Sequence, residues 1–423
     1  MVDVWMPYGN TEICVRVPTE NILNIIEPNE KGAAGNSQGE VENALMNPIG
    51  TNRLTEIVKA GAKVVIVLKD SGASDNQMMI SAISKELNSA GVKDEDITVI
   101  VAYNPLNAST AKSEETLLND FSSKIRVIHH NCEHSEHIKV GETSWGTKVH
   151  LNKIFAEAEV KVLANYIEPH IYAGYSGGRD GVLPGVSNSE TVLNNLLLSL
   201  NPKAKRGVLK ANPVHEDMVE AAHLADVNFV LTAVKNVKHE IVKAFAGDID
   251  KAFDEGVKFV DEIYKIPVDG RADIVIVSSG GSSFDINLFE ACKYIDCVFE
   301  VAKRGGVVVL VAECSEGYGN NEFYRFMSEF KDYDTLEKSL KKKFRIEGLI
   351  AYRLLKVLQR NEIFLVSAMP DYYALETFGM KTTRTANEAL RYAFDYVGRK
   401  GKVSVISHGN LMIPLIKGED EKK

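Results

Sequence analysis

The sequence of 423 residues lacks most features of secreted, membrane and disulfide-stabilised proteins. It has only five cysteines, an odd number without close framework spacing, which favours reduced thiols. No apolar run approaches the roughly 18 residues that span a bilayer. The segment from Met1 to Pro7 has neither the basic nor the apolar region of a secretory signal. We therefore expect a cytoplasmic protein.

Positive charge is also scarce. The formal net charge is −9 at pH 7, and the only basic triplet is at residues 341–343. No run of lysine and arginine is interleaved with aromatic residues, so the sequence argues against nucleic acid and against anionic membranes as partners. A small-molecule ligand is the expected partner, and the sequence does not indicate an oligomeric state.

Short, apolar, β-branched segments recur along the chain and alternate with segments of helix length. The predicted strands are Val64–Leu68, Ile97–Ala102, Ile125–Ile128, Val160–Ala164, Phe229–Thr232, Ile274–Ser278, Val307–Val311, Ile363–Val366 and Val403–Ile406. The predicted helices are Asn76–Ala90, Glu114–Phe121, Ser189–Ser199, Pro213–Ala225, Asp248–Ile263, Ile286–Lys303, Gly348–Gln359 and Asn387–Val397. This alternation predicts an α/β fold with mainly parallel sheets flanked by helices.

The chain is too long for one compact core and predicts two domains with a cleft between them. Residues Pro267 to Gly270 end a predicted helix and precede a new strand–helix–strand unit. This Pro/Gly link predicts an N-terminal domain of residues 1–268 and a C-terminal domain of residues 269–423.

The segment from Glu168 to Gly185 has five glycines and two prolines in eighteen residues, which excludes a helix or a strand interior. It follows a predicted buried strand, and His170 lies near its start. Residues Ser176–Arg179 offer backbone N–H groups, a hydroxyl and a guanidinium, which suit an anion or a cofactor phosphate. The alternative is a tight strand-to-helix connection with a surface histidine.

Three further segments carry chemically capable residues. Gly280–Ser283 precedes a predicted helix and could bind an anion, with Asp285 as its cap, or be a plain turn. Glu290 and Lys293 are three residues apart on one helix face, as in a common ion pair. His129–His137 contains four histidines and a cysteine, which could bind zinc or nickel, although their spacing matches no standard site and a polar loop is the alternative.

Several motifs together resemble the nickel-dependent lactate racemase family over nearly the whole chain. They are Pro169-His170, Ala173–Gly178, Leu183–Gly185, Gly141–Gly146, Asn212–Met218 and Glu313–Gly319. The resemblance implies an isomerase, a racemase or epimerase of a small 2-hydroxy acid. It also implies His170 and Lys293 as catalytic residues, and Arg179, Glu290 and Lys293 as substrate-binding residues.

The resemblance further implies a nickel pincer nucleotide that accepts hydride from the substrate, with Ser176, Gly177, Gly178 and Asp180 at the cofactor-binding positions. Asp180 stands where the family has a lysine linked covalently to that cofactor, and Leu196 stands where the family has a nickel-binding histidine. An acidic segment that includes an arginine is replaced by residues 69–73. Three readings stay open: a racemase holding the cofactor without a covalent link, a cofactor-free paralogue catalysing proton transfer or elimination, and a non-catalytic binding protein.

Overall fold

The computed structural model describes residues 1–69, 73–106 and 124–418, so the predicted helix Glu114–Phe121 lies outside the described residues. The chain forms two compact units. We call Glu30–Ile263 the continuous unit, and Met1–Asn29 together with Tyr264–Lys423 the split unit. This differs from the predicted division at residue 268, because a strand near the N-terminus, Ile22–Ile26, pairs with one near the C-terminus, Val403–Ile406.

The continuous unit contains a six-stranded sheet in the order β13-β12-β9-β4-β5-β6. Its strands are β4 Val64–Leu68, β5 Ile97–Val101, β6 Arg126–His129, β9 Val160–Tyr166, β12 Phe229–Lys235 and β13 Ile241–Gly247. All neighbouring strands are parallel except β12 and β13, which are antiparallel. Every residue of β4 and β9 is buried, as expected for parallel strands covered on both faces.

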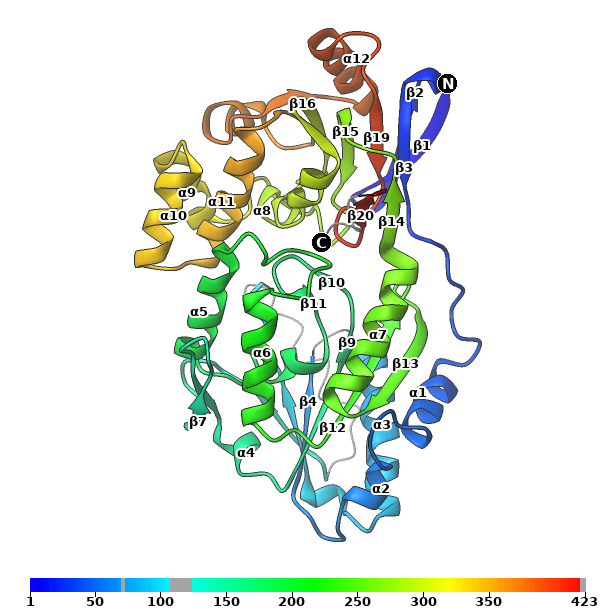
Figure 1. Ribbon diagram of the computed structural model, residues 1–423, viewed down its shortest axis with the longest axis vertical. Coiled ribbons are helices and arrows are strands. Elements are labelled where there is room, and N and C mark those ends of the chain that lie inside the picture. Colours follow the sequence, from blue (N-terminus) through cyan, green and yellow to red (C-terminus); the bar gives the residue numbers. More distant parts are fainter. Residues whose placement is uncertain (70–72, 107–123, 419–423) are drawn as a thin grey trace. The chain divides into compact units, whose positions relative to one another are not determined.

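Helices cover this sheet, and two short hairpins extend from it. The helices are α1 Ser37–Met46, α2 Leu54–Ile57, α3 Ala73–Ser89, α4 Lys153–Ala156, α5 Ser189–Leu197, α6 Pro213–Leu224 and α7 Ile249–Tyr264. The hairpins pair β7 His137–Glu142 with β8 Lys148–Asn152, and β10 Pro169–His170 with β11 Gly174–Tyr175. Figure 1 shows α6 and α7 on the side of the sheet opposite α3.

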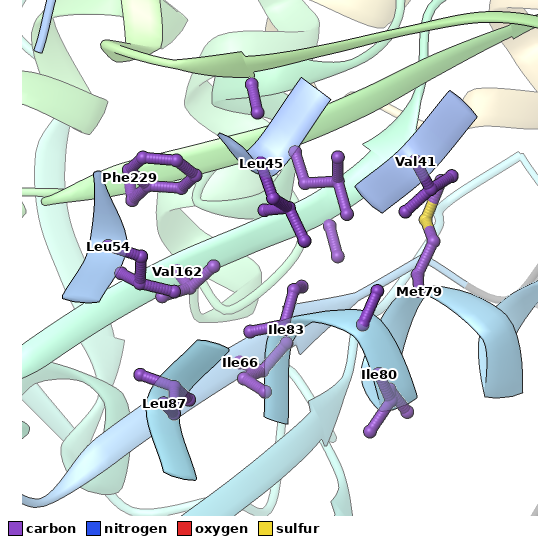
Figure 2. Close-up of a cluster of buried hydrophobic side chains, with 14 of the residues drawn as sticks. Val41, Leu45, Leu54, Ile66, Met79, Ile80, Ile83, Leu87, Val162 and Phe229 are labelled. Atoms are coloured by element: carbon purple, nitrogen blue, oxygen red, sulfur yellow. The ribbon is translucent and has the colours of Figure 1, made fainter. Parts of the chain in front are cut away.

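One face of the sheet packs against α1 and α3. Figure 2 shows Leu45 of α1 and Ile83 of α3 pointing toward Ile66, Val162 and Phe229 of the sheet. Each of these five side chains is buried. Burial of a large aliphatic side chain contributes about 1.5–3 kcal/mol, so this layer fixes β4 and β9, the two strands from which the candidate site extends.

The split unit contains a second six-stranded sheet, entirely parallel, in the order β18-β17-β16-β15-β19-β3. Its strands are β3 Ile22–Ile26, β15 Ala272–Ser278, β16 Ala302–Val311, β17 Glu362–Val366, β18 Lys381–Thr383 and β19 Val403–Ile406. Two pairs stand apart from it, β1 Val2–Tyr8 with β2 Thr11–Val17, and β14 Lys265–Val268 with β20 Ile413–Ile416. Its helices are α8 Leu288–Cys292, α9 Asn321–Glu329, α10 Tyr333–Lys342, α11 Ile346–Leu358 and α12 Ala386–Val397.

The α/β prediction is confirmed, and all nine predicted strands are present. The predicted helix Ile286–Lys303 is wrong in extent. Helix α8 ends at Cys292, a short 3-10 helix covers Ile295–Glu300, and β16 already begins at Ala302. The apolar side chains of both helical pieces point inward, so their spacing looks continuous in the sequence. Among the described residues, no helix combines the length and apolar character needed to cross a membrane.

The strand order of the continuous unit places its ligand-binding edge. From β4 the chain continues to β5 and β6 on one side, and then returns to β9 and β12 on the other. The loops after β4 and β9 therefore leave the sheet in opposite directions. Ligands of open α/β sheets bind at the carboxyl ends of the strands at such a reversal point. The Gly-rich segment follows β9 and so begins at this point.

Candidate functional site

The Gly-rich segment folds back on the end of β9. The Ser176 hydroxyl lies 3.1 Å from the carbonyl oxygen of Tyr166, and the Ser176 N–H donates to the carbonyl of Glu168 at 2.8 Å. The β10–β11 hairpin lies between these contacts. Ser176 is buried, so its hydroxyl serves the loop itself.

Gly177 and Gly178 allow the loop to lie directly against β9. Both have positive φ, 93° and 54°. A Cβ on Gly177 would lie 2.7 Å from Ile167 Cγ1, too close for any other residue. The Gly177 N–H donates to Asp180 at 2.8 Å and the Gly178 N–H donates to Asn165 at 2.9 Å. The donors predicted to hold a cofactor phosphate are therefore occupied within the loop.

Asp180 is enclosed by groups that favour a carboxylate. Its Oδ1 accepts from Asn165 Nδ2 at 2.9 Å, and its Oδ2 accepts from the Gly177 N–H. Lys69, at the end of β4, places its Nζ 3.6 Å from Oδ2. Asp180 thus joins the loop to both strands at the reversal point.

The Arg179 side chain links three backbone carbonyls of the loop to one another. It is buried and donates to the carbonyls of Gly177, Ala173 and Tyr175 at 3.0, 3.1 and 2.9 Å. The guanidinium also lies 4.1 Å from the centre of the Phe253 ring. Burial lowers the pKa of Arg179 to about 10, and nearby aspartates oppose that shift. This geometry gives Arg179 a structural role in the loop, and its role as a substrate anchor stays a prediction.

The loop fixes the tautomer of His170. Its Nδ1 accepts a hydrogen bond from the Ala173 N–H at 3.2 Å, so in the neutral ring the proton is on Nε2. The ring also meets Tyr172 edge to face, with centroids 4.4 Å apart. His170 is held as a hydrogen-bond donor at Nε2.

Leu196 lies on α5 and its side chain is buried, so this position offers no metal ligand. The residue before it, Asn195, donates to Asp217 Oδ2 at 2.8 Å. Asp217 also accepts from the hydroxyls of Thr143 and Thr147. Burial raises the pKa of Asp217, and these three donors oppose the shift. Two motifs singled out in the sequence, Gly141–Gly146 and Asn212–Met218, therefore meet in a structural cluster.

His215, near the start of α6, is a half-buried histidine that stays neutral. Its ring stacks on Phe253 with centroids 6.1 Å apart, and its Nδ1 has no hydrogen-bond partner among the described residues. Burial, reinforced by the charge of Arg179, lowers the pKa of His215 to about 3. The Phe253 ring thus contacts both the His215 ring and the Arg179 guanidinium.

The histidine segment 129–137 does not form a metal centre. Among residues 1–69, 73–106 and 124–418, no group of three or more His, Cys, Asp or Glu side chains is arranged to hold a metal ion. His130 uses both ring nitrogens, with Nε2 2.9 Å from the Ser187 carbonyl and Nδ1 3.2 Å from Asn152. Burial lowers the pKa of His130 to about 4. The polar-loop alternative is the better description.

These two histidines predict acid sensitivity. His130 and His215 stay neutral in the folded state but gain protons near pH 6.5 when unfolded. The two neutral rings stabilise the folded state fully above that pH. As the pH falls from about 6.5 toward 4, the free energy of unfolding decreases by up to about 1.4 kcal/mol per pH unit for each ring. Urea unfolding at several pH values should show this loss. In His215→Phe the proton uptake on unfolding should drop by about one, and an unchanged slope would contradict the assignment.

In the split unit, Glu290 and Lys293 form an ion pair on α8. Lys293 Nζ lies 2.7 and 2.6 Å from the two carboxylate oxygens of Glu290, and 5.0 Å from the Phe289 ring centre. The Lys293 side chain is 1% exposed, and burial lowers its pKa while Glu290 opposes the shift. The structure shows the pair that the spacing predicts, and the substrate-binding roles of both residues stay predictions.

The sequence suggests Asp285 as the cap of α8, but the structure shows that Asp285 does not cap this helix. The helix begins at Leu288 and its cap is Asn287, whose side chain accepts from the Glu290 N–H. Asp285 instead accepts from the backbone N–H groups of Gly9 and Glu313 at 2.8 and 3.1 Å. It fastens the β1–β2 turn to the loop after β16. Helix α8 has only five residues and begins at Leu288, so its dipole does not support an anion site at Gly280–Ser283.

Comparison with known proteins identifies the family. Residues 8–207 match the lactate racemase N-terminal domain, and residues 268–413 match the lactate racemase C-terminal domain. The chain belongs to the lactate racemase family. It is 32% identical to the lactate racemase of Thermoanaerobacterium thermosaccharolyticum over 97% of this chain and 98% of that protein. It is 29% identical to the lactate racemase of Lactiplantibacillus plantarum over 97% and 99%.

Solved structures agree with this assignment. The lactate racemase apoprotein of T. thermosaccharolyticum superposes with a TM-score of 0.87 and 30% identity, covering 98% of this chain and all of that one. A protein from Thermotoga maritima shares the fold, with a TM-score of 0.64 and 15% identity over 92% of this chain and all of that one. The lactate racemase fold therefore extends through both units.

The nickel pincer nucleotide does not fit the residues at its family positions. Asp180 cannot form the linkage of a lysine, and its carboxylate is already bonded to Asn165 and Gly177. Leu196 carries no donor atom. The N–H groups of Gly177 and Gly178 are already bonded to Asp180 and to Asn165 of β9. The residues that the structure describes at these positions therefore do not fit that cofactor.

Sequence reasoning missed Lys69 and Asn165, the partners of Asp180. Both carry a sequence signal. Lys69 directly follows an apolar predicted strand, and Asn165 interrupts the apolar run that begins at Val160. A polar side chain at the carboxyl end of a buried parallel strand lies on the edge where ligands bind, so both positions could have been predicted.

Proposed function

We propose that this lactate racemase homologue is a racemase or epimerase of a small 2-hydroxy acid, acting in the cytoplasm. Two observations support this proposal most directly. The chain matches lactate racemase sequences over 97% of its length, and its Gly-rich loop holds His170 in one tautomer. None of its five cysteines forms a disulfide, which supports a reducing compartment. Inversion at Cα requires removal of hydrogen from one face and its return on the other.

His170 is the proposed catalytic residue at the substrate hydroxyl. With Nδ1 bonded to the Ala173 N–H, the neutral ring donates from Nε2 to an oxygen of the ligand. A neutral imidazole in this orientation stabilises negative charge that develops on that oxygen. For Nε2 to accept a proton, the ring would have to change tautomer and lose the Ala173 contact. Nitrogen-15 NMR of the ring should show the Nε2–H form at neutral pH.

Lys293 is the proposed anchor of the substrate carboxylate. Lys293→Ala should weaken binding of a 2-hydroxy acid about 10- to 100-fold, because a charge-assisted hydrogen bond contributes about 1.5–3 kcal/mol. Glu290→Gln is the matched variant, since it removes the carboxylate now paired with Lys293. Stronger binding in this variant would assign the substrate contact to Lys293 alone, and weaker binding would support the predicted substrate-binding role of Glu290. Calorimetric titration measures both. Reduced stability in both variants with unchanged affinity would make the pair purely structural.

The test of the function is stereochemical. Each enantiomer of lactate and of a panel of longer 2-hydroxy acids is incubated with the purified protein and separated by chiral chromatography. Formation of the opposite enantiomer, absent in His170→Ala, is the expected result. Complete retention of configuration across the panel, with the native protein folded, would contradict a racemase.

The second candidate function is a cofactor-free reaction that transfers a proton or eliminates a group. Asp180 and Leu196 favour it, since neither can serve the family cofactor. Deuterated water separates the two candidates. Proton transfer at Cα places solvent deuterium on that carbon, whereas inversion that uses a bound hydride acceptor would return the original hydrogen to it. Proton NMR of the recovered acid gives the answer directly.

A further inference from the structure

We propose that Lys69 is a positioning residue, which with Asp180 forms an ionic lock that holds the Gly-rich loop in place of the family's covalent attachment. The two side chains meet across the reversal point of the sheet, Lys69 from the end of β4 and Asp180 from the loop after β9. The lock itself does not depend on the proposed function. Its effect on ligand binding does.

Both ends of the lock are fixed by the backbone. The Lys69 N–H donates to the Ala164 carbonyl at 3.2 Å, which continues the pairing of β4 with β9 by one residue. Asp180 lies in the turn whose Gly185 N–H donates back to the Asp180 carbonyl at 2.9 Å. The backbone position of each residue is therefore fixed, and only the side chains must be ordered to form the pair.

The surroundings of Asp180 select a carboxylate over an ammonium. Two donors, Asn165 Nδ2 and the Gly177 N–H, point at its two oxygens, and the Lys69 ammonium completes the set. A lysine at position 180 would face two donors and a second positive charge. The site therefore could not return to the family arrangement by one substitution, and Asp180→Lys should destabilise the loop.

The lysine of this pair is less exposed than the lysine of the surface pair Lys63–Asp96, whereas the two aspartates are equally shielded. The side chains of Lys69 and Asp180 are 25% and 14% exposed, whereas Lys63, paired with Asp96 in the same unit, is 67% exposed. A shielded pair is screened less by salt and water. Lys63 therefore provides a matched control for Lys69.

The lock orients the residues that the function uses. Asp180 accepts a hydrogen bond from the Gly177 N–H. Arg179 donates to the carbonyls of Gly177 and Ala173. Ala173 in turn supplies the N–H that fixes the His170 ring. A change at Lys69 can thus reach His170 through a continuous series of hydrogen bonds without touching a ligand.

The experiment is a double-mutant cycle on the full-length protein with Lys69→Met, Asp180→Asn and both together. Each single variant should lower the melting temperature by about 4–8 °C, and the double variant should lose less than their sum. Backbone amides of Gly177 and Gly178 should exchange roughly tenfold faster in Lys69→Met. Lys69→Arg should recover most of the protection, and Lys63→Met should leave it unchanged.

Binding of lactate, measured well below the melting temperature, supplies the readout of positioning. Lys69→Met should weaken it at least threefold, whereas Lys63→Met should not. Additive losses in the cycle, or unchanged exchange at Gly177 and Gly178, would overturn the lock. An intact lock in a protein that binds none of the hydroxy acids would instead overturn the proposed function.

Discussion

Replacing His170 with alanine is expected to lower turnover of the 2-hydroxy acid by about 100- to 1,000-fold, the usual contribution of one preorganised hydrogen-bond donor to developing negative charge. The ring is only partly buried, and its contacts include a hydrogen bond accepted from the Ala173 N–H and an edge contact with Tyr172. Its loss should therefore change the melting temperature by only a few degrees. Chiral chromatography of lactate after incubation measures turnover, and calorimetry measures stability.

The matched control for His170 is His215, a histidine of the same unit with no ligand-facing role in this proposal. His215→Phe keeps the stack on Phe253 and should retain turnover. His170→Asn retains a side-chain acceptor for the Ala173 N–H, but its shorter side chain cannot also place a donor where the Nε2–H of His170 lies. Full activity in His170→Asn would show that only the loop conformation matters. Lost activity in His215→Phe with an intact fold would move the assignment to α6.

The largest loss of stability is expected at Arg179. Arg179→Leu leaves the carbonyls of Gly177, Ala173 and Tyr175 without their donor and removes the contact with Phe253. We expect the free energy of unfolding to fall by about 3–5 kcal/mol. The melting temperature of a unit of this size should then fall by about 6–20 °C. Circular dichroism during heating measures it.

Arg126 is the matched control, since it is exposed on β6 of the same unit. Arg126→Leu should change the free energy of unfolding by no more than about 0.5 kcal/mol. Arg179→Lys separates charge from geometry. A lysine ammonium cannot reach all three carbonyls in the way that the planar guanidinium does, so Arg179→Lys should recover only part of the stability. If Arg179→Leu kept full stability but lost hydroxy-acid binding, Arg179 would have its predicted role as a substrate anchor.

Much of the fold follows from the sequence because buried parallel strands are apolar throughout. Val64–Leu68 and Val403–Ile406 were predicted to the residue. The strands of the N-terminal region, β1 to β3, were not predicted. Their residues alternate or are partly exposed, and β3 joins the sheet only through β19, about 380 residues later in the chain. No local pattern reports such a pairing.

The site was predicted by position better than by role. The glycines, His170 and the unusual residues Asp180 and Leu196 were all identified from the sequence. What Arg179 contacts could not be, because a guanidinium in a Gly-rich loop looks the same whether it faces a ligand or three carbonyls of its own loop. The Lys69–Asp180 pair required knowledge that β4 and β9 are neighbours, which depends on the strand order.

The division of the chain also sets an order of folding during synthesis. The continuous unit is one uninterrupted stretch, so it can fold as soon as its last helix has left the ribosome. The first 29 residues must wait much longer, because β3 pairs with β19, which is synthesised almost last. Until then the strand edge of β3 is an unpaired template for other chains. Translation that stops before residue 403 should therefore release a protein with a folded continuous unit and an aggregation-prone N-terminus.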